Sequence, residues 1–463
     1  MDYDMIIIGS GPGGYVAAIR ASQLKMKVAV VEKADIGGVC LNWGCIPTKS
    51  LLRSAQVYDD LKNASDYGIT VSGELKADFA AIIARSRSVA EGMSKGVQFL
   101  FRKNNITLIR GRGRLAGGSN VEIEDDEGNK TIKSARHIIL ATGARSKELP
   151  GLKQDGKKVI GYREAMNLPV QPGSMVIVGS GAIGSEFANF YQSVGTAVTL
   201  VEFLPRLVPN EDEEVSRQLE RSFRKMKMKI MTGSSVEAAD TSGEKCIVTI
   251  KTPKGTETVE SDIVLSAVGV TTNIEGLGLE EAGVRIDRDK VVVDEWYRTS
   301  VEGIYAIGDI VHGPALAHVA SAEGIICAGK IAGLDVEALD YGNIPACTYT
   351  NPEIASLGYT EAAAKSAGYE TKVGKFPFTA SGKASAAGSR DGFIKLIFDA
   401  AYGELLGAHM IGANVTEMIS GLVVARKLES TAQEIMRSVH PHPTMSEAIM
   451  EAAAAAYGEA IHI

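Results

Sequence analysis

The hydrophobic pattern of the first 33 residues predicts a strand, a turn, a helix and a second strand. Met5–Ile8 is a short apolar run, and Gly9–Gly14 is a glycine-rich turn. Apolar side chains recur at helical spacing over Tyr15–Leu24. Val28–Val31 is a second apolar run that ends at Glu32. This order is typical of a βαβ unit in a parallel sheet.

The same pattern returns 170 residues later. It consists of an apolar strand, a glycine-rich turn, a helix and a second strand that ends at an acid: Met175–Val178, Gly179–Gly184, Ser185–Val194, Ala197–Val201 and Glu202. In both copies the acid follows the first glycine by 23 residues. A spacing repeated in this way predicts two βαβ units of the same design.

Further segments are expected to add strands to the two units. Val121–Lys133 and Arg136–Leu140 lie between the copies, Asp262–Val268 follows the second copy, and Gly303–Asp309 is an apolar run closed by Gly-Asp. From about residue 344 short strands such as Phe393–Phe398 alternate with helices. The sequence therefore predicts an α/β fold with two Rossmann-like dinucleotide-binding domains and a C-terminal α+β domain. We expect domains at residues 1–147, 148–271, 272–343 and 344–463.

The amino-acid composition argues against a disordered, membrane-spanning, nucleic-acid-binding or disulfide-rich protein. Of 463 residues, 45% are hydrophobic and 23% charged, so the chain can bury a large core and is not disordered. No apolar run approaches about 18 residues, so no membrane span is expected. The 49 basic residues are scattered among 56 acids, and the net charge is −7, which predicts no nucleic-acid partner. Five cysteines are too few for a disulfide scaffold, and no targeting segment is visible, so a cytoplasmic location is expected.

The repeated glycines have separate tasks in a dinucleotide site. The first makes a tight turn, the second lets the backbone approach a pyrophosphate, and the third lets the helix pack closely on the strand. The helix N-terminus then offers N–H groups to phosphate, and the acid would accept hydrogen bonds from ribose hydroxyls. These residues are Gly9, Gly11, Gly14 and Glu32 in the first copy and Gly179, Gly181, Gly184 and Glu202 in the second.

Two such sites suggest FAD and a nicotinamide dinucleotide, although purely structural turns are the alternative. Glu202 favours NAD over NADP, because a carboxylate repels a 2′-phosphate. The next three residues, Phe203 to Pro205, include no cation, and Arg206 is the nearest one.

Cys40 and Cys45 form the most informative pair of residues. On a regular helix their Cα atoms would lie about 8–9 Å apart, beyond the reach of a disulfide. Gly44 and Pro47 would let the segment distort and bring the sulfurs together. A strained disulfide is easily reduced, which suits redox catalysis. Zinc is the alternative, but two further ligands with matching spacing are missing, and no metal site is predicted. The other three cysteines, Cys246, Cys327 and Cys347, are expected to be buried small residues.

These residues together carry a family resemblance. Gly37–Lys49 matches the motif GGxCLNxGCIPxK, and His440–Glu447 matches HxHPTxSE. Tyr349–Glu353 is similar to YTxPE, and the segments around Thr142, Asp309 and Ala317 are similar to flavin-contacting segments. The chain resembles the two-cysteine flavoprotein disulfide reductases, and within them the dihydrolipoamide dehydrogenases, over its whole length.

The resemblance implies a function and partners. Residues 1–147 and 272–343 would bind FAD, residues 148–271 NAD, and residues 344–463 would form a dimerisation domain. The enzyme would oxidise protein-bound dihydrolipoyl groups and reduce NAD. Its partners would be a second copy of the chain, in a homodimer, and the lipoylated E2 or H-protein component of a 2-oxo acid dehydrogenase or glycine cleavage complex.

The resemblance also implies individual roles. Cys40 would exchange with dihydrolipoamide, and Cys45 would lie next to the flavin. Lys49 would lie near the flavin N5 and pair with Glu186. The catalytic base would be a histidine from the other subunit, oriented by a carboxylate: His442 and Glu447. Further FAD contacts would be Gly38, Gly113, Thr142, Gly143, Asp309 and Ala317, and further NAD contacts would be Gly269 and Val236.

The base also follows from thiol chemistry. A thiol with a pKa near 8.5 needs a base to become a reactive thiolate, and imidazole titrates near neutral pH. A carboxylate on its other nitrogen would fix the tautomer. The alternative is that His440 and His442 are loop residues held by their neighbouring prolines.

Some residues depart from the family pattern, and rival functions remain. Val270 stands where the family often has Arg, and Trp43 within the cysteine motif has no role that the sequence explains. Glutathione reductase is disfavoured by Glu202, and mercuric reductase by a C-terminus without a cysteine pair. A non-catalytic flavin-bearing scaffold is disfavoured by the presence of both the cysteine pair and the His–Glu pair.

Overall fold

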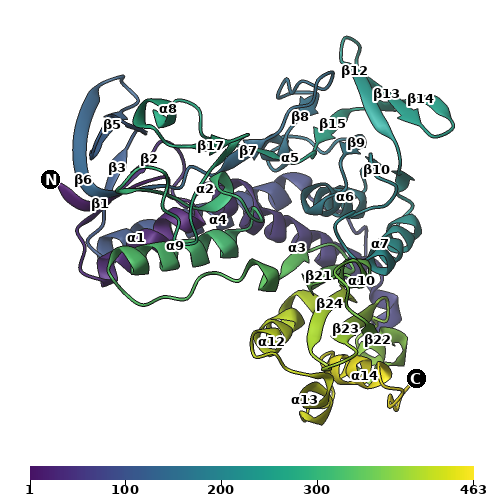
Figure 1. The fold of residues 1–463 in the computed structure, drawn as a ribbon. Coiled ribbons are helices and arrows are strands. Elements are labelled where there is room, and N and C mark those ends of the chain that lie inside the picture. Colours follow the sequence, from purple (N-terminus) through teal and green to yellow (C-terminus); the bar gives the residue numbers. More distant parts are fainter. The chain divides into compact units, whose positions relative to one another are not determined.

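The computed structural model describes residues 1–463 (Figure 1). The chain forms two compact units. None of the helices combines the length and the apolar character needed to cross a bilayer. Unit 1 consists of Met1–Leu51, Ala80–Lys147 and Gly269–Tyr341, and unit 2 consists of Leu52–Phe79, Glu148–Val268 and Gly342–Ile463.

Unit 1 is built on a sheet of seven strands in the order β3-β2-β1-β6-β5-β4, with β19 also paired to β6. The pairs of β1 with β2 and β6, of β2 with β3 and of β6 with β19 are parallel, whereas β4 and β5 add an antiparallel extension. Its strands are β1 (Tyr3–Ile8), β2 (Val28–Glu32), β3 (Thr107–Arg110), β4 (Arg112–Leu115), β5 (Asn120–Glu124), β6 (Lys130–Leu140) and β19 (Ile304–Ala306).

Two helices of unit 1 pack side by side: α1 (Pro12–Gln23) and α9 (Ala317–Ile331) (Figure 1). A Cβ on Gly324 would lie 2.7 Å from the carbonyl oxygen of Gly13, so their close approach requires glycine. Helix α1 begins three residues before the predicted start, because Gly11 is its N-cap and Pro12 suits the first helical position. The long helix α4 (Phe79–Lys103) was not predicted.

Unit 2 contains the second βαβ unit in a five-stranded parallel sheet, with the order β11-β10-β9-β15-β8. An antiparallel sheet of three strands, β12 to β14, lies between β11 and β15 along the chain. The elements are β8 (Val159–Ile160), β9 (Ser174–Val178), α6 (Ala182–Val194), β10 (Ala197–Val201), α7 (Glu213–Lys225), β11 (Lys229–Met231), β12 (Ser235–Asp240), β13 (Cys246–Thr252), β14 (Gly255–Ser261) and β15 (Ile263–Ser266).

The remaining elements up to residue 343 lie outside these sheets. They are α2 (Gly38–Trp43), α3 (Cys45–Lys62), η1 (Ala64–Tyr67), β7 (Ala144–Ser146), α5 (Tyr162–Ala165), β16 (Val270–Thr272), α8 (Leu279–Ala282), β17 (Ile286–Asp287), β18 (Lys290–Val291), η2 (Gly308–Ile310) and η3 (Tyr341–Asn343).

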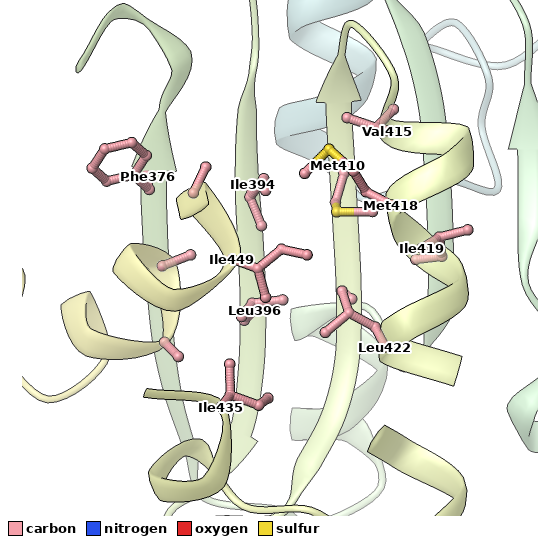
Figure 2. Packing of buried hydrophobic residues seen from close by; sticks show 14 of the residues in the cluster. Phe376, Ile394, Leu396, Met410, Val415, Met418, Ile419, Leu422, Ile435 and Ile449 are labelled. Carbon is pink, nitrogen blue, oxygen red and sulfur yellow. The ribbon is translucent and has the colours of Figure 1, made fainter. Parts of the chain in front are cut away.

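The C-terminal part of unit 2 is an antiparallel sheet with the order β20-β21-β24-β23-β22. One face of this sheet is apolar. Ile394, Leu396 and Met410 lie toward the helices that carry Met418 and Ile449 (Figure 2). The elements are β20 (Ala346–Thr348), β21 (Glu353–Gly358), α10 (Glu361–Ser366), β22 (Thr371–Pro377), η4 (Phe378–Ala380), α11 (Gly382–Ala386), β23 (Phe393–Asp399), β24 (Leu405–Gly412), α12 (Val415–Lys427), α13 (Ala432–Arg437) and α14 (Glu447–Ala455).

The opposite face of the same sheet carries a polar row. Because side chains alternate along a strand, Lys395 points away from its neighbours Ile394 and Leu396. It stands in register with Lys375 on one side and with His409 on the other, and His409 is in register with Ser356. We refer to Lys375, Lys395, His409 and Ser356 as the polar row.

Glu211, just before α7, lies against the polar row. The carboxyl is buried and is hydrogen-bonded to Ser356. Burial raises the pKa of Glu211 to about 7, the Ser356 hydrogen bond opposes this rise, and the neighbouring Asp212 adds to it. The folded protein therefore holds this carboxyl protonated over a pH range in which the unfolded chain ionises it.

We expect Glu211→Gln to remove a pH-dependent loss of stability. Below about pH 4.3 the Glu211 carboxyl is protonated in both states, and as pH rises toward 7 only the unfolded state gains from ionisation. The variant cannot ionise, so its stability relative to wild type should rise by about 2–3 kcal/mol between pH 4.5 and 8. Urea unfolding of both proteins across this range measures the change, and a difference independent of pH would contradict it.

Candidate dinucleotide and disulfide site

The first glycine turn has the geometry that a dinucleotide requires. Gly9 adopts φ +107°, and a Cβ on Gly14 would lie 2.0 Å from the Gly9 carbonyl oxygen. Gly11 is the N-cap of α1 and has no atom within 4 Å of the position of a Cβ, which leaves its backbone open to a ligand. No side chain caps this helix, so its first N–H groups can bind phosphate.

The second glycine turn has nearly the same φ angle and the same close backbone contact as the first. Gly179 adopts φ +97°, and a Cβ on Gly184 would lie 1.9 Å from the Gly179 carbonyl oxygen. Gly181 is the N-cap of α6 and is open in the same way as its counterpart. Both glycine turns thus fit the pyrophosphate of a dinucleotide.

In each copy the glutamate at the end of the second strand accepts hydrogen bonds from the serine between the first two glycines. We call this arrangement the serine–glutamate lock. Glu32 Oε2 accepts hydrogen bonds from the backbone N–H and the hydroxyl of Ser10, at 2.8 and 2.7 Å. Glu202 Oε2 accepts the same two bonds from Ser180, at the same distances. The two serines were missed in the sequence, although both copies read Gly-Ser-Gly.

These locks orient the acids without using all of their hydrogen-bonding capacity. The second oxygen of each carboxylate accepts one further backbone N–H, from Ala34 for Glu32 and from Leu204 for Glu202, at 2.9 and 2.8 Å. A carboxylate offers about four lone-pair sites, so one site on each remains for a ribose hydroxyl.

The remaining residues predicted to contact FAD lie in unit 1. Gly38 opens α2, and a Cβ there would lie 2.7 Å from the Cα of Gly11. Gly143 adopts φ +69° and accepts a hydrogen bond from the Asn273 N–H at 2.9 Å, while the Thr142 hydroxyl donates to the Asn273 carbonyl at 2.7 Å. Gly113 lies in β4, and Ala317 is the first residue of α9.

Asp309 is half-buried in η2, at the end of β19. Burial raises the pKa of its carboxyl, and the nearby Lys290 opposes this rise. Gly308 beside it donates its N–H to Glu323 at 2.6 Å, which fixes the turn. A half-buried acid on a fixed turn suits a hydroxyl-bearing ligand such as the ribityl chain of FAD.

The further residues predicted to contact NAD lie in β12 and in the loop between β15 and β16. Val236 is half-buried in β12. Gly269 adopts φ +105°, and its carbonyl accepts a hydrogen bond from the Lys147 N–H.

The cysteine segment is a helix broken between the two sulfurs. Helix α2 ends at Trp43 and α3 begins at Cys45, with Gly44 at φ −149° and ψ −116° between them. The predicted distortion at Gly44 is confirmed. Pro47 lies in the first turn of α3, where a helix tolerates proline.

The two sulfurs are in contact. The structure shows the pair as thiols, with the Cys40 thiol hydrogen-bonded to Cys45. This hydrogen bond and burial raise the pKa of Cys40, and Lys49 opposes them. Cys40 is half-buried and Cys45 is exposed. A pair five residues apart thus lies close enough for disulfide chemistry.

Helix α4 holds this segment in place, and the sequence did not reveal it. Arg87 donates to the carbonyl of Asn42 at 2.7 Å and lies 4.4 Å from the Trp43 ring, a cation–π contact. The Trp43 indole donates to Asp35 at 2.7 Å. These contacts explain Trp43, which anchors the end of α2.

Two neighbours of Arg87 on α4 also donate hydrogen bonds to α3. Ser86 donates to the Pro47 carbonyl, and Arg85 donates to the Ser50 hydroxyl.

The predicted base, His442, and its carboxylate, Glu447, are in contact within unit 2. His442 Nδ1 lies 2.8 Å from Glu447 Oε1, and the Thr444 N–H donates to the other carboxylate oxygen at 2.8 Å. Burial acts to raise the pKa of Glu447, but Thr444 and His442 lower it on balance. The His442 side chain is 79% exposed, so its Nε2 is presented outward. His440 instead lies 2.9 Å from the Ser438 carbonyl.

The structure also places the predicted Lys49–Glu186 pair and the three cysteines outside the pair. Lys49 lies on α3 in unit 1, and Glu186 lies buried on α6 in unit 2, where it accepts a hydrogen bond from the Tyr349 N–H at 3.0 Å. The pairing of Lys49 with Glu186 stays a prediction. Cys246 and Cys327 are buried as expected, whereas Cys347 is only half-buried at the edge of the C-terminal core.

Sequence comparisons identify relatives that cover the whole chain. The chain is 49% identical over 462 residues to dihydrolipoyl dehydrogenase of Zymomonas mobilis and 48% identical over 476 residues to that of Rhizobium etli. Each alignment covers 99% of both chains. The crystal structure of LpdA from Mycobacterium tuberculosis is similar with a TM-score of 0.91 and 28% identity, covering 97% of this chain and 98% of that one.

These relatives confirm several predictions. The α/β fold with two Rossmann-like sheets and a C-terminal dimerisation domain is confirmed, as are the oxidoreductase class and the use of FAD and NAD. The dimerisation domain, matched over residues 344–453, also supports the predicted homodimer. Residues 3–324 match the family model of the pyridine nucleotide-disulphide oxidoreductases, and residues 344–453 match the model of their dimerisation domain. The chain therefore belongs to the pyridine nucleotide-disulphide oxidoreductases.

Proposed function

We propose that this chain oxidises protein-bound dihydrolipoyl groups to lipoyl disulfide and reduces NAD, as the E3 component of a 2-oxo acid dehydrogenase or glycine cleavage complex. The observation that carries the proposal is the contact between Cys40 and Cys45 across the break at Gly44. The identity of 49% to a dihydrolipoyl dehydrogenase over the whole chain supports it.

The chemistry begins with the base. His442, oriented through Nδ1 by Glu447, takes the proton of a dihydrolipoyl thiol at Nε2. The thiolate attacks Cys40 of the oxidised Cys40–Cys45 pair, and Cys45 leaves as a thiolate. The second dihydrolipoyl sulfur then displaces Cys40, so lipoyl disulfide is released and the enzyme holds two thiols. When bound, FAD supplies the two-electron acceptor between these thiols and NAD.

The chain's own residues determine where the cofactors are held. Gly9, Gly11, Gly14 and Glu32 would bind the FAD dinucleotide, and Asp309 its ribityl chain. The corresponding residues of the second site, Gly179, Gly181, Gly184 and Glu202, would bind NAD. The other predicted contacts, Gly38, Gly113, Thr142, Gly143, Ala317, Val236 and Gly269, and the role of Lys49 with Glu186 belong to the same proposal.

The partner, the subunit origin of the base, the domain bounds and the location are also part of this proposal. A lipoylated E2 or H-protein component is the partner that delivers the substrate, and His442 is contributed by the other subunit of the homodimer. The domain bounds 1–147, 148–271, 272–343 and 344–463 stay a prediction. The cytoplasmic location also stays a prediction.

We expect Cys40→Ser to reduce dihydrolipoamide-dependent reduction of NAD to the uncatalysed background, because serine forms no mixed disulfide. FAD should stay bound in the variant, since Cys40 holds no predicted cofactor contact. Cys246→Ser, at a buried cysteine of β13, serves as the control and should keep its activity. Loss of FAD from Cys40→Ser, or turnover that survives in it, would count against the proposal.

We expect Glu202→Gln to weaken NAD use by about tenfold in kcat/KM, since it removes a charge-assisted hydrogen bond worth about 1.5–3 kcal/mol. The preference for NAD over NADP should narrow, because the repulsion of the 2′-phosphate is lost. Steady-state kinetics with both nucleotides measures this effect, and FAD content serves as the check on folding. An unchanged ratio of NAD to NADP use would refute the role of Glu202.

We expect Glu447→Gln to lower kcat by about 10²-fold, because an amide no longer fixes the proton-accepting tautomer of His442 or stabilises its cation. The matched control is Glu451→Gln, one turn further along α14. Glu451 pairs with His462 Nδ1 at 2.7 Å in the same manner, but it has no role in the proposed reaction. Anaerobic reduction of the flavin by dihydrolipoamide, followed against pH, compares the two variants. Equal loss in both would show that Glu447 acts only on stability.

A further inference from the structure

Lys395 is a buried cation in the polar row of the C-terminal sheet. Its side chain is only 3% exposed, and every other residue of β23 and β24 is buried as well. Three carboxylates surround its ammonium group: Asp212 at 3.1 Å, Glu214 at 3.0 Å and Glu361 at 2.8 Å. The desolvation of such a group often costs as much as its ion pairs return. Stability is therefore a weak explanation for its presence.

Two of its partners lie at the start of α7, which follows the second βαβ unit along the chain. Asp212 is the N-cap of α7, and its Oδ1 accepts the N–H of Glu214 at 3.0 Å. Lys395 contacts both oxygens of the Asp212 carboxylate, at 3.1 and 3.2 Å. The lysine on β23 thereby fixes the point at which α7 begins.

The turn of residues 203–212 leads into α7, and it is hydrogen-bonded through Val208 to the second glycine turn. Val208 donates its N–H to the carbonyl and to the hydroxyl oxygen of Ser180, at 3.2 and 3.3 Å. Ser180 is the residue that locks Glu202. Val208 also adopts φ +39°, which is costly for a β-branched residue. This strained conformation persists only where the surrounding contacts impose it.

We propose that Lys395 is a positioning residue for NAD. By holding Asp212, it keeps the turn of residues 203–212 against Ser180 and Glu202, and these residues shape the adenosine end of the NAD site. The inference rests on the proposed function of the second glycine turn and extends it to a residue of the C-terminal sheet, far away in sequence.

The alternative is that Lys395 only joins two parts of unit 2. If Lys395 had only this structural role, its loss would lower the stability of the protein and weaken all of its activities to the same extent. A positioning role instead raises the dissociation constant for nucleotides that contain the adenosine half, while leaving FAD and the reaction with dihydrolipoamide intact. The two readings therefore differ in a measurable way.

The test uses the full-length, FAD-loaded protein and three variants. Lys395→Met removes the charge and keeps most of the apolar stem. Lys395→Met combined with Asp212→Asn also removes the carboxylate that would be left buried and unpaired, and asparagine still caps a helix. Lys375→Met is the matched control, because Lys375 neighbours Lys395 in the polar row and also contacts Glu214, but its side chain is 41% exposed.

Calorimetric titration with NAD and with ADP-ribose measures the affinity of each protein without turnover. We expect both nucleotides to bind about 5- to 20-fold more weakly to the two Lys395 variants, a change of about 1–2 kcal/mol. Binding to Lys375→Met should match wild type. FAD content and the rate of flavin reduction by dihydrolipoamide should be unchanged in all three variants.

Affinity within twofold of wild type in a folded Lys395 variant would overturn the inference. So would equal weakening in Lys375→Met, or a parallel loss of flavin reduction by dihydrolipoamide. If Lys395→Met does not fold, the double variant decides. Failure of the wild-type protein to bind NAD would overturn the proposed function itself, and it would be seen before any variant is compared.

Discussion

The contact between the third and the first glycine of each turn is the constraint on which both nucleotide sites depend. A Cβ at Gly14 or Gly184 would lie within about 2 Å of a carbonyl oxygen, a distance that no side chain permits. This contact brings the helix N-terminus to the carboxyl end of the central strand. The N–H groups proposed to bind phosphate and the acid proposed to bind ribose then stand at one edge of each sheet.

The carboxylates at this edge are part of the architecture before any ligand binds. Each one accepts three hydrogen bonds, from a serine hydroxyl and two backbone N–H groups. The acids therefore stay oriented, and a ribose meets an arrangement that needs no reorganisation. The same two serine–glutamate hydrogen bonds occur in both copies, so one local design recurs in the sites proposed for FAD and NAD.

The redox segment and the NAD site are each supported from a distance in sequence. Helix α4 holds the broken helix through Arg85, Ser86 and Arg87, so that the two cysteines keep their contact. Lys395 holds the start of α7, from which the turn returns to Ser180. In both cases a reactive or binding group lies on an irregular segment, and a regular element supplies the rigidity.

The sequence by itself determined the features that depend on local backbone geometry. The glycine spacing predicted the two turns, since only glycine fits a close approach or a positive φ, and Gly44 predicted the break between the cysteines. Tertiary structure alone decided the partners of Ser10 and Ser180, the contact of Arg87 with Trp43, and the burial that raises the pKa of Glu211. It also decided that Lys395, in an apolar strand, would face three carboxylates. Such contacts join residues separated by 20 to nearly 200 positions, and no local pattern of hydrophobic and polar residues records which distant side chains the fold brings together.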